Sequence, residues 1–144
     1  MTLADESATV EAGARLAKVV RAGDVITMTG DLGAGKTTLV RGLLRALGHD
    51  GEVPSPSFAI VQPYEDLEPP VWHADLYRVE NVAELPELGL DSLDDAVLVV
   101  EWPERAGGSA WPNALGLSLD FAEGGARRLT AQVPPAWEGR WPPR

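Results

Sequence analysis

Gly30-Asp31-Leu32-Gly33-Ala34-Gly35-Lys36-Thr37-Thr38 decides the fold, because it matches the phosphate-binding pattern G-x-x-x-x-G-K-[ST] at every position. Val25 to Met28, just before it, is short, apolar and partly β-branched, which predicts a buried strand. After it, apolar residues recur every three or four positions from Leu39 to Leu47, which predicts an amphipathic helix that ends before Gly48. Strand, glycine-rich loop and helix are the context that this motif requires.

The loop and the start of the helix predict a site for the phosphates of a nucleoside triphosphate. Gly33 and Gly35 let the backbone turn tightly, so that N–H groups of the loop and of the helix N-terminus point at phosphate oxygens. Lys36 is expected to reach the β- and γ-phosphates. We expect the Thr37 hydroxyl to bind Mg²⁺ and Thr38 to support the α-phosphate.

Two further acidic residues stand where strands are expected to end. Residues 71–76 alternate strictly, which predicts a strand with Asp75 near its carboxyl end, the edge where α/β proteins bind ligands. The apolar run 96–100 leads directly into Glu101, which predicts a Mg²⁺ ligand, direct or through water, although such an acid can also cap a helix. Asp75 is left between a catalytic or metal-linked role and a turn cap. His73 is expected to be a packed, hydrogen-bonded histidine.

The rest of the chain predicts a single α/β domain over residues 1–133. Its predicted elements are a helix from Ser7 to Arg21, a strand from Phe58 to Val61, a short helix from Asn81 toward Leu88, and a hairpin of residues 115–121 and 129–133. Residues 134–144 contain four prolines and two tryptophans without periodicity, and we expect a poorly ordered tail there.

Composition narrows the function classes. The 144 residues contain no cysteine, which excludes disulfides, thiolate catalysis and cysteine-ligated metals. We find neither a membrane-length apolar run nor a signal-peptide pattern, so we expect a cytoplasmic protein without membrane contact. The segment from Glu52 to Glu104 contains thirteen acidic residues and one basic residue, so its net charge is −12, compared with −10 for the whole chain. This balance disfavours direct nucleic-acid binding, and it suits either docking on a basic protein surface or a solvated acidic face.

Four further stretches add a family signal to the phosphate loop. They are Ser55-Pro56-Ser57-Phe58, His73-Ala74-Asp75-Leu76-Tyr77-Arg78, Glu84-Leu85-Pro86-Glu87-Leu88-Gly89 and Val100-Glu101-Trp102-Pro103. Together, in this order and spacing, they resemble the bacterial ATPase subunit of tRNA N6-threonylcarbamoyladenosine (t6A) synthesis, the TsaE type, over roughly residues 5–133. Ser57 departs from the threonine that is frequent in this family, but it keeps the hydroxyl.

The resemblance implies a small P-loop NTPase domain whose mixed central sheet is flanked by helices and ends in antiparallel strands. ATP phosphates would lie on residues 33–38, including Ala34, with Mg²⁺ on Thr37 and Glu101. Lys36, Asp75 and Glu101 would serve hydrolysis, Ser55 and Ser57 would lie in a switch-like loop, and Glu6 would lie near the base.

The resemblance also implies how such a protein works. It would be a weak ATPase alone, stimulated by docking on the TsaB/TsaD-type pair that transfers threonylcarbamoyl to adenosine 37 of tRNA. ATP hydrolysis would reset that complex, and the protein would meet tRNA only indirectly.

Two other functions stay open from the sequence. A small-molecule kinase also combines a phosphate loop with an acidic strand end, but it needs arginines to clamp the phosphoryl group, and between Arg45 and Arg105 only Arg78 is present. A nucleotide-gated binding module that never hydrolyses ATP would carry the same motif, with Asp75 and Glu101 holding Mg²⁺ without aligning a water molecule.

Overall fold

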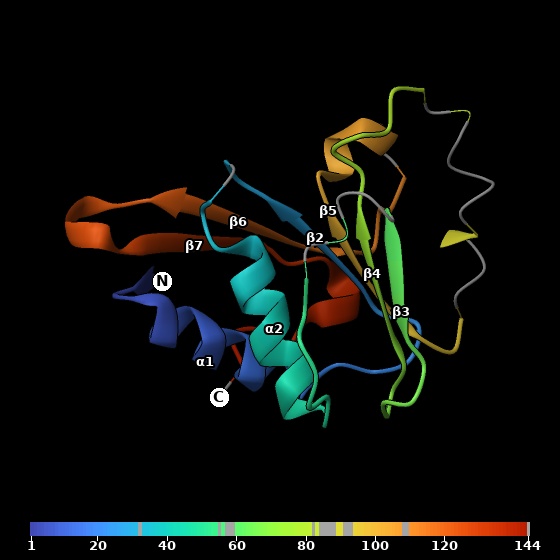
Figure 1. Cartoon of the computed structure of the whole chain (residues 1–144), viewed down its shortest axis with the longest axis horizontal. Coiled ribbons are helices and arrows are strands. Elements are labelled where there is room, and N and C mark those ends of the chain that lie inside the picture. Colours follow the sequence, from blue (N-terminus) through green and yellow to red (C-terminus); the bar gives the residue numbers. More distant parts are fainter. Residues whose placement is uncertain are drawn as a thin grey trace.

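A computed structural model of the chain describes residues 1–31, 33–54, 56, 60–81, 83, 89–90, 94–107 and 110–143. Over these residues the chain forms one seven-stranded sheet in the order β1-β7-β6-β2-β5-β4-β3, with helices α1 and α2 packed on one face (Figure 1). The strands are β1 Thr2–Leu3, β2 Val25–Thr29, β3 Val61–Tyr64, β4 Val71–Asp75, β5 Val97–Glu101, β6 Leu115–Phe121 and β7 Arg127–Gln132. The helices are α1 Glu6–Leu16 and α2 Lys36–Ala46, with short 3-10 turns η3 Pro103–Ala106, η4 Glu123–Gly125 and η5 Pro135–Trp137.

The sheet is mixed, as expected. Strand β2 lies parallel to both β5 and β6, and β4 lies parallel to β5. The outer pairs β3 with β4, β6 with β7 and β1 with β7 are antiparallel. This confirms the mixed sheet and the C-terminal hairpin, and it brings the carboxyl ends of β2, β4 and β5 to one edge. In that register Glu101 pairs with Met28 on one side and with Asp75 on the other.

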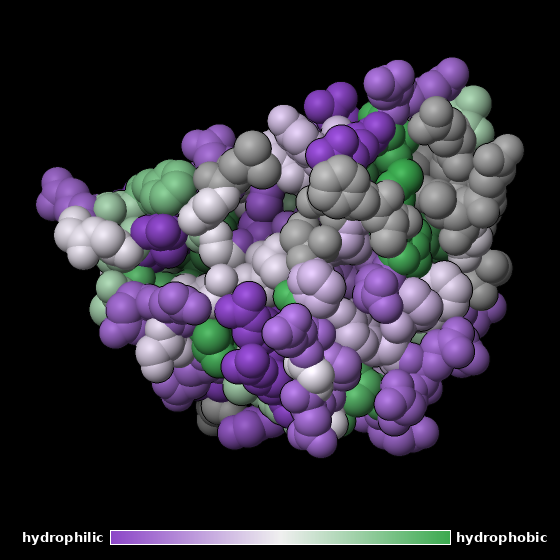
Figure 2. Space-filling view, in the orientation of Figure 1, coloured by the Kyte–Doolittle hydropathy of each residue, from purple (hydrophilic) through white to green (hydrophobic). Residues whose placement is uncertain are grey.

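The two helices cross at a backbone contact that only glycine permits. A Cβ atom on Gly13 of α1 would lie 2.0 Å from the carbonyl oxygen of Leu39, and one on Gly42 of α2 would lie 2.0 Å from that of Val10. Side chains therefore cannot separate α1 from α2 at the crossing. Their shared outer face is mostly hydrophilic (Figure 2), while their inner residues join the core over β2 and β6.

Two predicted boundaries differ from the structure. The helix expected to run from Ser7 to Arg21 ends at Leu16, where the N–H groups of Lys18 and Val19 bond three residues back and tighten the chain into a turn. The strand expected from residue 58 begins only at Val61, because Ile60 has a left-handed backbone with φ of 68°. Residues 57–59 lie outside the described residues. Most of the short helix expected from Asn81 toward Leu88 lies outside them as well.

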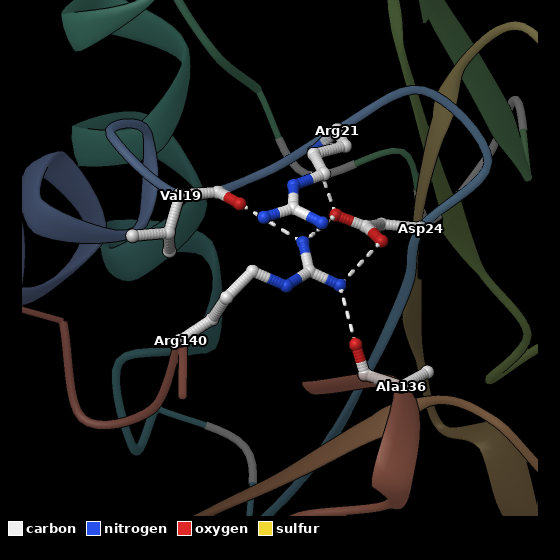
Figure 3. A network of polar contacts seen from close by, with 5 residues as sticks. All are labelled: Val19, Arg21, Asp24, Ala136 and Arg140. Atoms are coloured by element: carbon white, nitrogen blue, oxygen red, sulfur yellow. Dashed lines mark hydrogen bonds and ion pairs between the residues drawn. The ribbon is translucent and has the colours of Figure 1, made fainter. Parts of the chain in front are cut away.

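The C-terminal segment packs on the domain, in contrast to the loose tail that the sequence predicts. Trp137 is only 1% exposed and belongs to the main core. Arg140 stacks on the Trp137 ring at 4.0 Å. Its guanidinium also reaches the turn before β2 (Figure 3). There it donates to both carboxylate oxygens of Asp24, at 2.7 and 3.0 Å, and to the Val19 carbonyl at 2.9 Å. One aromatic anchor and one ion pair order a segment that has no periodicity.

We expect Arg140→Ala to lower the free energy of unfolding by about 2 kcal/mol, because it removes charge-assisted bonds from a nearly buried carboxylate. Urea denaturation followed by circular dichroism measures the change. The matched control is Arg15→Ala, which breaks an exposed ion pair with Glu11 (side chains 48% and 64% exposed) and should cost at most about 0.5 kcal/mol. Equal losses in the two variants would contradict a structural role for the Arg140–Asp24 pair.

Candidate functional site

The phosphate loop connects β2 to α2 with the backbone that its glycines allow. Gly30, Gly33 and Gly35 all have positive φ, and Gly35 is the residue that precedes the first turn of α2. A Cβ on Gly30 would lie 2.3 Å from the Leu119 carbonyl oxygen, so this glycine is also required by the adjacent strand. Within the described chain no side chain caps α2, which leaves the N–H groups of its first turn facing outward. This arrangement is suited to an anion.

Lys36 lies at the mouth of this loop and is only 4% exposed. Its Nζ donates to the Gly30 carbonyl at 2.6 Å and lies 3.9 Å from the centroid of the Trp102 ring. Burial lowers the pKa of Lys36, and the carboxylates of Glu101 and Asp75 oppose that shift. The Lys36 ammonium therefore interacts electrostatically with two carboxylates, while its hydrogen bond goes to a backbone carbonyl.

Thr37 and Glu101 meet across the loop. The Thr37 hydroxyl donates to Glu101 Oε2 at 3.3 Å, and Glu101 is 3% exposed at the end of β5. A hydroxyl and a carboxylate at the start of a phosphate-binding helix are the oxygen ligands that Mg²⁺ takes together with phosphates and water. Among the residues that the structure describes, no cluster of three or more His, Cys, Asp or Glu could hold a metal unaided. The donor set therefore fits a Mg²⁺ that arrives with a nucleotide.

Asp75 lies beside Glu101 on the neighbouring strand and is also buried. Its Oδ1 accepts a hydrogen bond from the Tyr77 N–H at 2.9 Å, which closes the turn after β4. The structure thus shows Asp75 capping the turn, at the ligand edge of the sheet. Its catalytic or metal-linked role remains a prediction.

His73 is packed and hydrogen-bonded, as expected, but its partner belongs to the site. Its Nε2 lies 2.6 Å from Glu101 Oε2, and its side chain is completely buried. Because His73 precedes Asp75 by two positions, it lies diagonally across β4 and β5 from Glu101 on the same face.

Glu6 lies on the other side of the loop, in a pocket of about 310 Å³. Asp5, just before it, caps α1 by accepting from the Ala8 N–H at 2.8 Å. The pocket is lined by Asp5, Glu6, Thr9, Gly33, Ala34, Gly35, Thr38, Arg41, Gly125 and Arg127. The predicted residues Glu6, Gly33, Ala34, Gly35 and Thr38 therefore share one cavity.

Arg127 is a residue of this site that the sequence analysis missed. From the start of β7 it donates through Nε to the Ala34 carbonyl at 3.2 Å and through Nη2 to that of Gly33 at 3.4 Å. It also stacks on Phe121 at 4.5 Å. No local motif marks an arginine 93 residues from the loop, and only the hairpin's return beside the loop brings it there.

Ser55 and Ser57, expected in a switch-like loop, lie outside the described residues.

The family model for threonylcarbamoyl adenosine biosynthesis protein TsaE matches residues 3–129. A "tRNA threonylcarbamoyladenosine biosynthesis protein TsaE" of Streptomyces coelicolor is 47% identical over 118 residues, covering 79% of this chain and 80% of the relative. One from Synechocystis is 45% identical over 109 residues, covering 72% and 69%. The crystal structure of YdiB from Bacillus subtilis superposes with a TM-score of 0.77 at 28% identity, covering 92% of this chain and 83% of that one.

Proposed function

This chain belongs to the TsaE family of threonylcarbamoyl adenosine biosynthesis proteins, and from that premise we propose a Mg²⁺-dependent ATP-binding protein and weak ATPase. It would support threonylcarbamoyl transfer to adenosine 37 of tRNA in the cytoplasm. It would dock on a TsaB/TsaD-type pair, reset that pair by hydrolysing ATP, and leave the transfer itself and the tRNA contacts to its partners.

The observation that carries this proposal is the contact between Thr37 Oγ1 and Glu101 Oε2, 3.3 Å apart, at the start of a helix whose first turn is open to an anion. The contact joins the phosphate loop to the end of β5, two segments that are 64 residues apart. A hydroxyl on a bound Mg²⁺ and a carboxylate beside it are the recurring parts of phosphate-loop ATPases.

The chain's own groups would divide the work. Backbone N–H groups of residues 33–38 would bind the phosphates, and Lys36 would move from the Gly30 carbonyl toward the γ-phosphate. Thr37 and Glu101 would hold Mg²⁺, which neutralises the charge of the β- and γ-phosphate oxygens. Asp75, beside Glu101, would orient the attacking water. Glu6 and Arg127 would border the nucleoside.

Weak activity of the protein alone also fits the contacts around Asp75. One oxygen of this carboxylate already accepts the Tyr77 N–H at 2.9 Å, so Asp75 is held by the turn after β4 and not aimed only at a water. A partner that moves this turn would change how Asp75 addresses the water. The acidic segment between Glu52 and Glu104 would favour a partner with a basic surface.

The test is ATP hydrolysis by the purified protein, alone and with its transferase pair. We expect slow turnover alone and marked acceleration with the pair. A rate that ignores the pair would contradict the proposed docking. A single-turnover experiment with no ADP, even with the pair present, would instead identify a non-hydrolysing nucleotide-gated module. A burst of ADP that depends on an added small-molecule acceptor would identify a kinase.

A further inference from the structure

Glu101 is a carboxylate that the fold must hold against a high cost of burial. It is 3% exposed at the end of the interior strand β5, which lies between β2 and β4. A buried carboxylate is stable as the charged form only where hydrogen-bond donors replace water. Two side chains in the described part of the chain supply them: Thr37 at 3.3 Å and His73 at 2.6 Å.

These two donors differ in what happens when a nucleotide binds. The Thr37 hydroxyl lies on the phosphate loop, and under the proposed function its oxygen is taken by Mg²⁺. His73 lies on β4, a strand hydrogen-bonded to both β3 and β5, and its side chain is fully buried. The His73 contact is therefore the one that can stay unchanged between the free and the loaded states.

The hydrogen bonds from Thr37 and His73 both end on the same carboxylate oxygen, Oε2 of Glu101. They therefore fix the rotation of the carboxylate group and leave Oε1 pointing away from both donors. The other ring nitrogen of His73, Nδ1, is buried and has no hydrogen-bond partner among the described residues. A buried N–H without a partner is costly, so the proton belongs on Nε2, where it is donated to Glu101.

We propose that His73 is a positioning residue that orients the Glu101 carboxylate for Mg²⁺. The inference rests on the proposed function, because it assumes that Glu101 serves a Mg²⁺–nucleotide. In this proposal His73 would act through its contact with Glu101 and would touch neither the metal nor the nucleotide. It acts as histidine–carboxylate pairs do around metal sites, where an outer hydrogen bond sets the orientation of the inner ligand.

The test uses two amide substitutions that differ in reach. His73→Gln places an amide nitrogen near the position of Nε2 and keeps the donor, whereas the shorter His73→Asn does not reach Glu101. Binding of a non-hydrolysable ATP analogue is measured by isothermal titration calorimetry in EDTA and across a range of Mg²⁺ concentrations. We expect His73→Asn to raise the Mg²⁺ concentration for half-maximal enhancement of binding by about 10-fold or more, with binding in EDTA unchanged. His73→Gln should stay within about 3-fold of the natural protein.

A packing control separates orientation from stability. Val71 is fully buried on the same strand and face as His73. Val71→Ala should lower the melting temperature without moving the Mg²⁺ midpoint. The inference is overturned if His73→Asn keeps the natural midpoint, or if Val71→Ala shifts it as much as His73→Asn does. If the natural protein binds the analogue equally in EDTA and in Mg²⁺, the proposed function fails and takes this inference with it.

Discussion

Lys36→Ala is expected to weaken ATP binding by about 100-fold, equivalent to about 2.8 kcal/mol. Lys36 is the buried ammonium at the loop mouth, and the triphosphate would lose its main countercharge together with a charge-assisted hydrogen bond. Titration calorimetry with ATP and Mg²⁺ measures the loss, and circular dichroism checks the fold.

The control for Lys36 is Lys18→Ala, which removes the same charge from an exposed position after α1. It should bind ATP as the natural protein does. A similar loss in both variants would mean that net charge, and not the loop lysine, governs affinity. Unchanged ATP affinity and turnover in Lys36→Ala would remove the phosphate-binding assignment of the loop altogether.

Glu101→Gln is expected to reduce Mg²⁺-dependent hydrolysis by about 100-fold or more, since the amide keeps the shape but gives up the charge that would hold the metal. ATP binding in EDTA should persist. The measurement is ADP release under single-turnover conditions, with the partner pair present to raise the signal.

Glu104→Gln serves as the matched variant for Glu101. It removes an exposed acid three residues later that also raises the pKa of Lys36, so it reports on charge near the lysine without touching the Thr37 contact. Its rate should be close to natural. If Glu101→Gln hydrolyses ATP normally, the metal is held elsewhere, and Asp75→Asn becomes the next variant to measure.

The parts of this fold that the sequence predicts are those encoded within a few residues. The glycine–lysine pattern predicts the loop between β2 and α2, apolar runs predict β2 and β5, and alternation predicts the hairpin of β6 and β7. Glu101 is foreseeable because the strand that carries it ends in the carboxylate itself. The roles assigned to these residues remain predictions.

The parts that the sequence does not predict depend on long-range contacts. Arg127 reaches the loop across 93 residues, and His73 reaches Glu101 across 28. In the sequence each of them looks like an ordinary strand residue, because its neighbour at the site is known only once the order of the strands in the sheet is known. From the sequence, Trp137 is likewise only part of a proline-rich C-terminal segment. Its neighbours in the chain do not indicate that its side chain is buried in the core. The positive φ of Ile60 could not be predicted either, because such a backbone is normally expected at a glycine.

The packed C-terminal segment also has a consequence for when this protein can fold during synthesis. The Met1 amino group bonds the carbonyl of Leu129, 128 residues away, and Arg140 bonds Asp24 across 116 residues. Strand β2, in the middle of the sheet, pairs along one edge with β6, which is synthesised about 90 residues later. The native core can therefore close only after β6 and Arg140 have been synthesised. Until β6 is added, one edge of β2 is unpaired and exposes backbone N–H and C=O groups that another chain could pair with.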